Sequence, residues 1–201
     1  SRLNYVKTNF PNVAVKSLVN DEIDADTGRR IASFSERRIH AKGVRLRHDV
    51  ERIVALARDC GFVTLLLVDG RICAGSINYR IGANVFGEII AHDPEYERHG
   101  FGTLCVYHTI CESIRTGVRK FYLGGGQFVF KERMLGKRLD MDKLQIYRSR
   151  TRLLANLDLA AVAYAHGQIG RLKAKLHERK GTPLADLVFR VFHAYKNTTG
   201  K

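Results

Sequence analysis

Three short apolar segments joined by tight turns limit what this chain can fold into more than any other feature. They span Phe62–Val68, Arg71–Tyr79 and Asn84–Ala91. Asp69–Gly70 separates the first two, a short turn with Gly82 separates the second two, and both connections are typical of β-hairpins. Strands joined by so few residues pair antiparallel, so this part of the chain predicts an antiparallel sheet.

Helices and further strands flank these hairpins. Acidic residues at Asp24 and Asp26 precede a helical apolar pattern, and Gly61 follows another, as helix starts and stops do. In chain order, the periodicity predicts a strand over 12–19, helices over 26–42, 49–60 and 103–117, a strand over 120–123, a helix over 127–135 and a strand over 143–147. Residues 1–149 therefore predict an α+β domain with a mostly antiparallel mixed sheet flanked by helices.

Residues 150–201 predict a basic, helical C-terminal extension, with helices over 153–164, 169–177 and 184–195. The first and the last of these carry wide apolar stripes that are costly to leave in water. We therefore expect the extension to pack on the domain or on a second copy in a homodimer. The basic segment Arg171–Lys180 between the stripes predicts a positive ridge suited to an anionic acceptor, an anionic polymer or a membrane surface.

The composition favours an anionic partner and a reducing compartment. There are 34 Lys and Arg against 20 Asp and Glu, a net charge of +14, which suits a nucleotide, a nucleic acid, an acidic polymer or a membrane surface. The four cysteines form no C-x-x-C pair, so we expect free thiols in the cytoplasm. The histidines show no metal-ligand spacing, so we expect no metal.

The turn that follows the third apolar segment carries the strongest functional signal. Gly100 and Gly102 lie between a strand and a long helix, where residues without a Cβ let the backbone approach a ligand closely. The amides of residues 98–103 then point into one concavity at the helix N-terminus. Such an arrangement binds anionic oxygens through hydrogen bonds and the helix dipole. A plain tight turn is the structural alternative.

This segment resembles the pyrophosphate-binding motif of the GNAT superfamily, the acyl-CoA-dependent N-acyltransferases. The family pattern of Asp-Pro-x-Tyr, a basic residue and Gly-x-Gly is matched by Asp93–Tyr96, Arg98 and Gly100–Gly102, whereas Glu97 stands where the family has Gln or Arg. The order of elements over residues 12–147 matches as well. The resemblance implies a GNAT-like fold with acetyl-CoA or another acyl-CoA as co-substrate. The residues it assigns to cofactor binding are Ala91, His92, Arg98, His99, Gly100, Phe101, Gly102 and Thr103.

A second segment, Tyr122–Lys131, resembles the strand–glycine–helix segment of the CelD/BcsL branch, associated with cellulose and polysaccharide biosynthesis. Gly124–Gly126 and Phe130–Lys131 carry the likeness. It implies an amine acceptor on a small molecule or sugar. Lys131 would then reach a phosphate or an acceptor carboxylate at the active site, and a solvent-facing helix lysine is the alternative.

The GNAT resemblance implies attack of a primary amine on an acyl-CoA thioester. Glu88 lies in the strand where the superfamily often carries an acidic base, and Phe86 and Ile90 are expected on its strand face. Such an apolar setting raises the pKa of a carboxyl group. A strand glutamate facing solvent is the alternative, and His92 or Asp93 would line the site instead.

The sequence leaves two other functions open. One is a Fem-like transferase that uses aminoacyl-tRNA, which the net charge of +14 favours. The other is a non-enzymatic, basic nucleic-acid-binding module on a degenerate acyltransferase core. The glycine turn suits a CoA pyrophosphate rather than tRNA, and the sequence contains no aromatic-interleaved RNA motif or known DNA-binding motif.

Overall fold

A computed structural model describes residues 2–125, 129–139 and 146–178. The chain divides into two compact units, Ser1–Gly136 and Lys137–Lys201. The predicted division at residues 149 and 150 stays a prediction.

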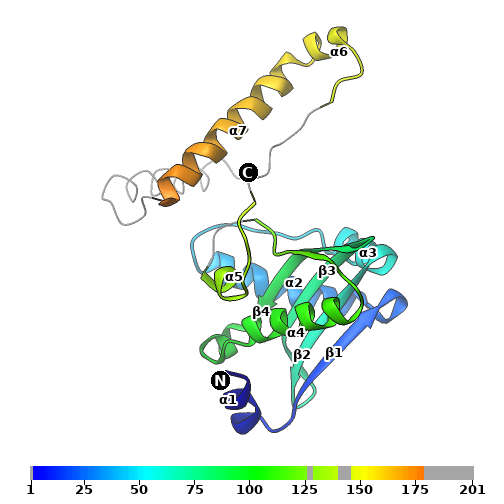
Figure 1. The fold of residues 1–201 in the computed structure, drawn as a ribbon, viewed down its shortest axis with the longest axis vertical. Helices are drawn as coiled ribbons and strands as arrows, with labels where there is room; N and C mark the ends of the chain where they lie inside the picture. Colours follow the sequence, from blue (N-terminus) through cyan, green and yellow to red (C-terminus); the bar gives the residue numbers. More distant parts are fainter. Residues whose placement is uncertain (1, 126–128, 140–145, 179–201) are drawn as a thin grey trace. The chain divides into compact units, whose positions relative to one another are not determined.

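The first unit is built on one five-stranded sheet with the order β1-β2-β3-β4-β5 (Figure 1). The strands are β1 (Val13–Val19), β2 (Gly61–Val68), β3 (Arg71–Ile81), β4 (Asn84–His92) and β5 (Lys120–Tyr122). Neighbours pair antiparallel from β1 to β4, and β5 pairs parallel with β4. The predicted mostly antiparallel α+β architecture is confirmed.

Both hairpins form where the turn residues predict them. Asp69 and Gly70 have φ values of 50° and 75°, and Gly82 has a φ of 60°. Positive φ values at both central residues of the first turn, and at the first central residue of the second, match the right-handed twist of the strands that they join. The tight turns thus fix β2, β3 and β4 as sequential neighbours.

Helices cover both faces of the sheet (Figure 1). The helices α2 (Ala25–His40) and α3 (Val50–Cys60) lie behind it, and α4 (Phe101–Arg115) lies in front. Asp24 caps α2 by accepting a hydrogen bond from the Thr27 amide at 2.6 Å, as its place in the sequence predicts. The core is correspondingly divided, with Phe34 fully buried behind the sheet and Phe101 fully buried on the α4 side.

Three short helices of the first unit are absent from the prediction. A helix α1 (Arg2–Asn9) precedes the sheet and buries Val6, a 3-10 helix η1 (Asn20–Glu22) follows β1, and a 3-10 helix η2 (Pro94–His99) fills the turn before α4. The predicted helix over 127–135 is α5 (Val129–Arg133), and its first residues lie outside the described ones. Most of the strand expected over 143–147 lies outside them as well.

The second unit contains α6 (Arg150–Leu154) and α7 (Leu157–Glu178). The separate helices expected over 153–164 and 169–177 are wrong, because α7 runs on through Gly167. A glycine inside a helix costs about 1 kcal/mol relative to alanine but breaks no hydrogen bond, unlike proline. The helix expected over 184–195 lies outside the described residues, and packing of the extension stays a prediction.

The described residues contain no helix that is long and apolar enough to cross a membrane. In the same ranges, no three His, Cys, Asp or Glu side chains gather as they would around a metal ion. All four cysteines are free; Cys73 and Cys105 are buried, and Cys60 and Cys111 are exposed.

Candidate active site

Strand β4 leaves its regular pairing at Glu88. Ile77 of β3 pairs with Ile89, whereas the next residue, Asn78, pairs with Gly87, so Glu88 is the extra residue of a β-bulge. Bulges bend a strand, increase its twist and occur often beside active sites, where they redirect a side chain. The bulge therefore changes the direction of β4 halfway along its length.

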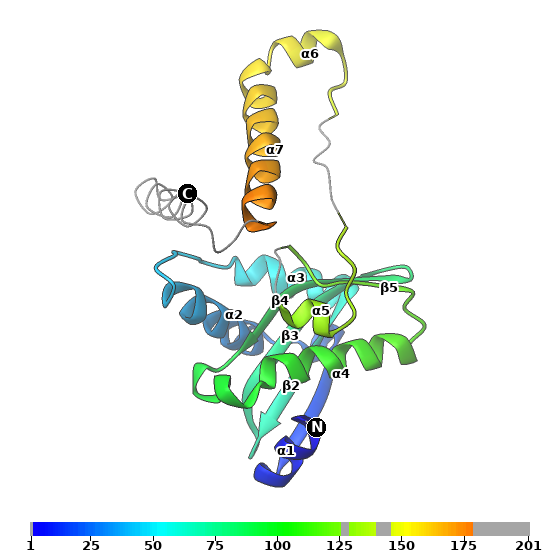
Figure 2. The same cartoon turned by 60° about the vertical axis from the view of Figure 1, so that its left-hand side comes forward.

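The pairing between β4 and β5 stops at the same place. Asn84, Val85 and Phe86 pair with residues 120–122, and the Phe86 and Tyr122 rings stack at 4.6 Å between centroids. Among the described residues, no strand pairs with Gly87–His92 on that edge. We call Gly87–His92 the open stretch of β4, and Figure 2 shows it continuing past the end of β5.

The glycine turn begins α4 beside this open stretch. Gly100 is the N-cap residue with a φ of 71°, and its carbonyl accepts the first helical hydrogen bond, from the Leu104 amide. The amides of residues 101–103 precede that bond, so they belong to the groups that a helix leaves without an internal partner. Phosphate oxygens bind well to such amides.

Gly102 is needed at this turn because of His92. A Cβ placed on Gly102 would lie 2.7 Å from the His92 Nδ1 atom, closer than real contacts allow. The first turn of α4 and the last residue of β4 are therefore in direct contact. Any side chain at position 102 must displace the imidazole.

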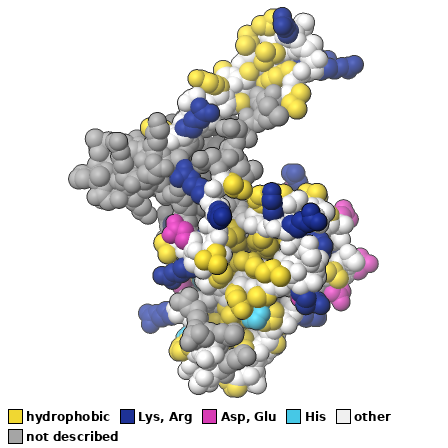
Figure 3. Space-filling model, in the orientation of Figure 1, with side chains coloured by type: hydrophobic (Ala, Val, Ile, Leu, Met, Phe, Trp, Pro, Cys, Tyr) yellow, Lys and Arg dark blue, Asp and Glu magenta, His cyan; other side chains and the backbone are white. Residues whose placement is uncertain are grey.

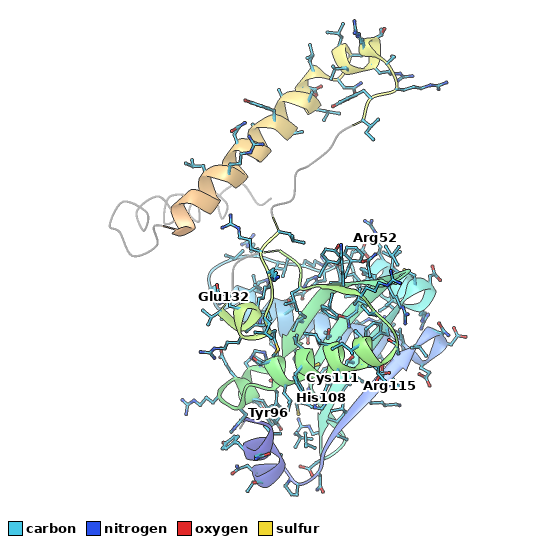
Figure 4. The ribbon with its side chains drawn as sticks, in the orientation of Figure 1. Arg52, Tyr96, His108, Cys111, Arg115 and Glu132 are labelled. Carbon is cyan, nitrogen blue, oxygen red and sulfur yellow. The ribbon has the colours of Figure 1, made fainter. Side chains whose placement is uncertain are left out.

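Three side chains of the turn serve packing instead of pointing to a ligand. Phe101 is fully buried, and the His99 ring lies edge-on to Phe10 at 4.9 Å and bonds through Nδ1 to the Tyr5 hydroxyl at 3.1 Å. Figure 4 shows Tyr96 in the same cluster, between α1 and the start of α4. A cofactor would thus meet Phe101 through its amide.

The remaining residues assigned to the cofactor differ in exposure. Ala91 is fully buried against the core behind the sheet, Arg98 is exposed and Thr103 is half-buried. Ala91 offers a ligand its backbone alone. Glu97, the departure from the family pattern, is exposed. The structure thus brings residues 91, 92 and 98–103 together at one end of β4.

Asp93 fastens this turn to α2, an interaction that the sequence did not predict. The carboxylate is 9% exposed and lies 3.8 Å from Arg30 Nη2 and 3.5 Å from Arg37 Nη2. Both guanidinium groups also lie over the Phe34 ring. Asp93 accepts a hydrogen bond from the Glu95 amide as well, so it positions the turn instead of lining the site.

The helix α2 runs beside β4 (Figure 2), and its Arg38 side chain reaches the open stretch. Its Nη2 donates a hydrogen bond to the Ile90 carbonyl at 3.5 Å. Burial lowers the pKa of His92, and the positive charge of Arg38 lowers it further. His92 is therefore neutral at pH 7, since its ordinary value of about 6.5 already lies below that pH.

The apolar setting expected for Glu88 is wrong. Glu88 is exposed, because the bulge interrupts the alternation that would place it beside Phe86 and Ile90. Its charge acts on Tyr79 of β3, where burial and the Glu88 charge together raise the pKa of the phenol to about 12. The solvent-facing alternative is the one observed, and the catalytic role of Glu88 stays a prediction.

Lys131 of α5 holds the chain that follows β5. Its Nζ atom donates hydrogen bonds to the carbonyls of Gly124 at 2.8 Å and Gly125 at 2.6 Å, and burial lowers its pKa. A Cβ on Gly124 would lie 3.3 Å from the Gly87 carbonyl, so this loop passes close to the start of the open stretch. Its predicted role at the acceptor stays a prediction.

Two open hollows lie elsewhere in the first unit. One of about 390 Å³ is lined by Cys60 and Arg80, and another of about 630 Å³ by Glu36 and His48. Neither lining includes residues 87–92 or 98–103. Neither of these two hollows is therefore part of the candidate site, which lies at an edge of the sheet.

The sequence matches the family model of the acetyltransferase (GNAT) domain over residues 20–132. This range covers more than half of the chain and contains β2 to β5, the bulge and the glycine turn. The chain belongs to the GNAT acetyltransferase family, and it is an acyl-CoA-dependent N-acyltransferase of that type. Members of the family use acetyl-CoA.

Several solved structures are similar to this chain at low sequence identity. An aminoglycoside acetyltransferase from an uncultured soil metagenomic sample, in complex with sisomicin, is 15% identical with a TM-score of 0.50; the match covers 71% of this chain and 98% of that one. The ribosomal-protein-S18-alanine N-acetyltransferase of Escherichia coli is 21% identical with a TM-score of 0.42, covering 53% and 62%. No curated protein matches the sequence.

Proposed function

We propose that this protein transfers an acetyl group from acetyl-CoA to the primary amine of a small molecule or sugar, with the reaction at the open stretch of β4. The observation that carries the proposal is the coincidence of the bulge at Glu88 with the end of β4–β5 pairing at Phe86. This leaves backbone groups of β4 beside the N-terminus of α4. A thioester and an anionic pyrophosphate need those two features next to each other.

On the cofactor side, the proposal rests on backbone groups. The amides of Phe101, Gly102 and Thr103 would bind the pyrophosphate through hydrogen bonds and the helix dipole. An amide of the open stretch near Ala91 would donate to the thioester carbonyl, where negative charge develops as the amine attacks. Alignment of two bound reactants removes as much as about 7–11 kcal/mol of the barrier.

On the acceptor side, we assign Glu88 the role of general base. Glu88 is exposed at the bulge, and its carboxylate would accept a proton from the acceptor ammonium, directly or through water, before attack on the thioester. The thiolate of CoA then leaves and takes a proton from the new ammonium or from water. We assign Lys131 a positioning role, because it holds the glycine loop next to Gly87.

The finer part of the proposal concerns the biological setting. The Tyr122–Lys131 resemblance favours a sugar amine in polysaccharide biosynthesis, and the free cysteines favour the cytoplasm. Nucleic acid is less favoured as a partner, because Lys and Arg side chains on the face in Figure 3 are spread around an apolar centre instead of forming one stripe.

The test is an acyl-CoA screen on the full chain. Acetyl-CoA should raise the melting temperature, and free thiol should appear when a primary amine is added. Longer acyl-CoA esters and a panel of sugar amines, amino acids and polyamines define the two substrates. If no acyl-CoA stabilises the protein and no amine releases thiol, the proposal is wrong.

A further inference from the structure

Arg38 of α2 contacts the open stretch of β4, and its guanidinium group lacks some of the hydrogen bonds that it could donate. Its Nε atom is buried and has no hydrogen-bond partner. In the part of the chain that the structure describes, its one hydrogen bond is the long contact of 3.5 Å from Nη2 to the Ile90 carbonyl. Buried polar atoms without a partner are rare in proteins, and each one calls for an explanation such as a bound ion or a functional role.

The other arginines of α2 have partners that account for their charge. Arg30 and Arg37 lie beside the buried Asp93 carboxylate, and Arg29 pairs with Asp26. No carboxylate of the described residues lies within ion-pair distance of Arg38. Arg38 is thus a guanidinium group of α2 without a carboxylate partner among the described residues, and it lies at the strand where the reaction is proposed.

The surroundings of Arg38 favour an anion over a neutral ligand. His92 is neutral, and Lys131 directs its ammonium to carbonyls of the glycine loop that passes close to Gly87. A guanidinium group has five donors in a planar fork that matches carboxylate and phosphate oxygens. An anionic group brought by a ligand would supply the acceptors that Arg38 lacks.

We infer that Arg38 is a specificity-determining residue that binds an anionic group of the amine acceptor, so that the preferred acceptors are amines carrying a phosphate or a carboxylate. The inference rests on the proposed function. It assigns the anion to the acceptor, not to acetyl-CoA, because Arg38 reaches β4 from α2, whereas the pyrophosphate amides lie at the start of α4 on the other face of the sheet.

The experiment compares two acceptors that differ by one phosphate, glucosamine and glucosamine 6-phosphate, in a thiol-release assay at fixed acetyl-CoA. The unaltered protein should prefer the phosphorylated sugar. Arg38→Gln should lower kcat/KM for that sugar by about 10- to 100-fold, the range for loss of a hydrogen bond to a charged group. It should change kcat/KM for glucosamine, and KM for acetyl-CoA, by less than about threefold. Amino acids and their amides form a second pair, which tests a carboxylate.

Two further variants separate recognition from structure. Arg38→Lys keeps the charge without the fork and should lie between the unaltered protein and Arg38→Gln. Arg29→Gln removes an exposed arginine of the same helix and should leave the preference unchanged. The preference of the unaltered protein between paired acceptors is informative even if Arg38→Gln does not fold.

The outcomes separate a failure of this inference from a failure of the proposed acetyl transfer. Equal use of both members of each pair, or an equal loss for both in Arg38→Gln, would overturn the inference and leave the acetyl transfer intact. A rise in KM for acetyl-CoA without a change in acceptor preference would assign Arg38 to a cofactor phosphate and would also overturn it. No thiol release with any amine would overturn the proposed function, and this inference with it.

Discussion

The two sides of β4 contribute to the site in different ways. On the side of α4, the proposed ligand contacts are made by backbone amides and glycines, while the Phe101 and His99 side chains pack into the protein. On the side of the bulge, an exposed Glu88 and a partly buried Arg38 present side-chain charge. Backbone contacts suit a cofactor that is the same in every member of a family, whereas side chains suit an acceptor that differs.

The largest effect is expected from a substitution of Glu88, on the bulge side of β4. Replacing it by glutamine keeps the size of the side chain and removes the base, so turnover should fall by about 10²- to 10⁴-fold with little change in KM for acetyl-CoA. Steady-state kinetics with saturating amine measures this. Glu51→Gln, an exposed glutamate of α3, is the control and should retain full turnover. If turnover of Glu88→Gln fell by less than threefold, the proton would be accepted by water, and Glu88 would not be the general base.

Gly102→Val tests the cofactor side. Acetyl-CoA at 100 times its dissociation constant should stabilise the unaltered protein by about 2.7 kcal/mol. The variant should lose this stabilisation, because the new side chain meets His92 and blocks the close approach of a phosphate. Thermal shifts with and without ligand measure it. Gly167→Ala, where the added methyl group meets open space in α7, should keep the full shift. An unchanged shift in Gly102→Val would mean that the cofactor binds elsewhere.

A smaller effect is expected at Asp93, which joins the turn to α2. Asp93→Asn should lower the free energy of unfolding by about 1–2 kcal/mol, less than for a fully buried pair because both arginines are about half exposed. Asp26→Asn, which breaks an exposed pair with Arg29, should cost less than about 0.5 kcal/mol. Urea unfolding compares the two, and equal losses would show that Asp93 does not fasten the turn.

The sequence predicts most of the sheet because its signals are local. The Asp69–Gly70 turn, the caps at Asp24 and Asp49 and the alternation within each strand involve residues close along the chain, and these elements form within a few residues of their predicted ends. The glycine turn is predictable for the same reason. The turn needs residues without a Cβ, and Gly100 and Gly102 meet that need within the turn itself.

The acceptor side is not predictable in this way. The bulge at Glu88 follows from the pairing of β3 with β4, so strand alternation alone assigned the residue to an apolar face. Contacts such as that of Arg38 with Ile90 join residues 52 positions apart, and no local pattern encodes them. Helix α1 is absent from the prediction because it has only eight residues and a weak amphipathic pattern, although Val6 is fully buried.

The most direct test of the account is hydrogen exchange of the full chain with and without acetyl-CoA. Binding at the open stretch predicts slower exchange in peptides that cover residues 87–92 and 98–104, with no change in a peptide that covers β1. Slower exchange only around Cys60 and Arg80, which line the hollow of about 390 Å³, would contradict it.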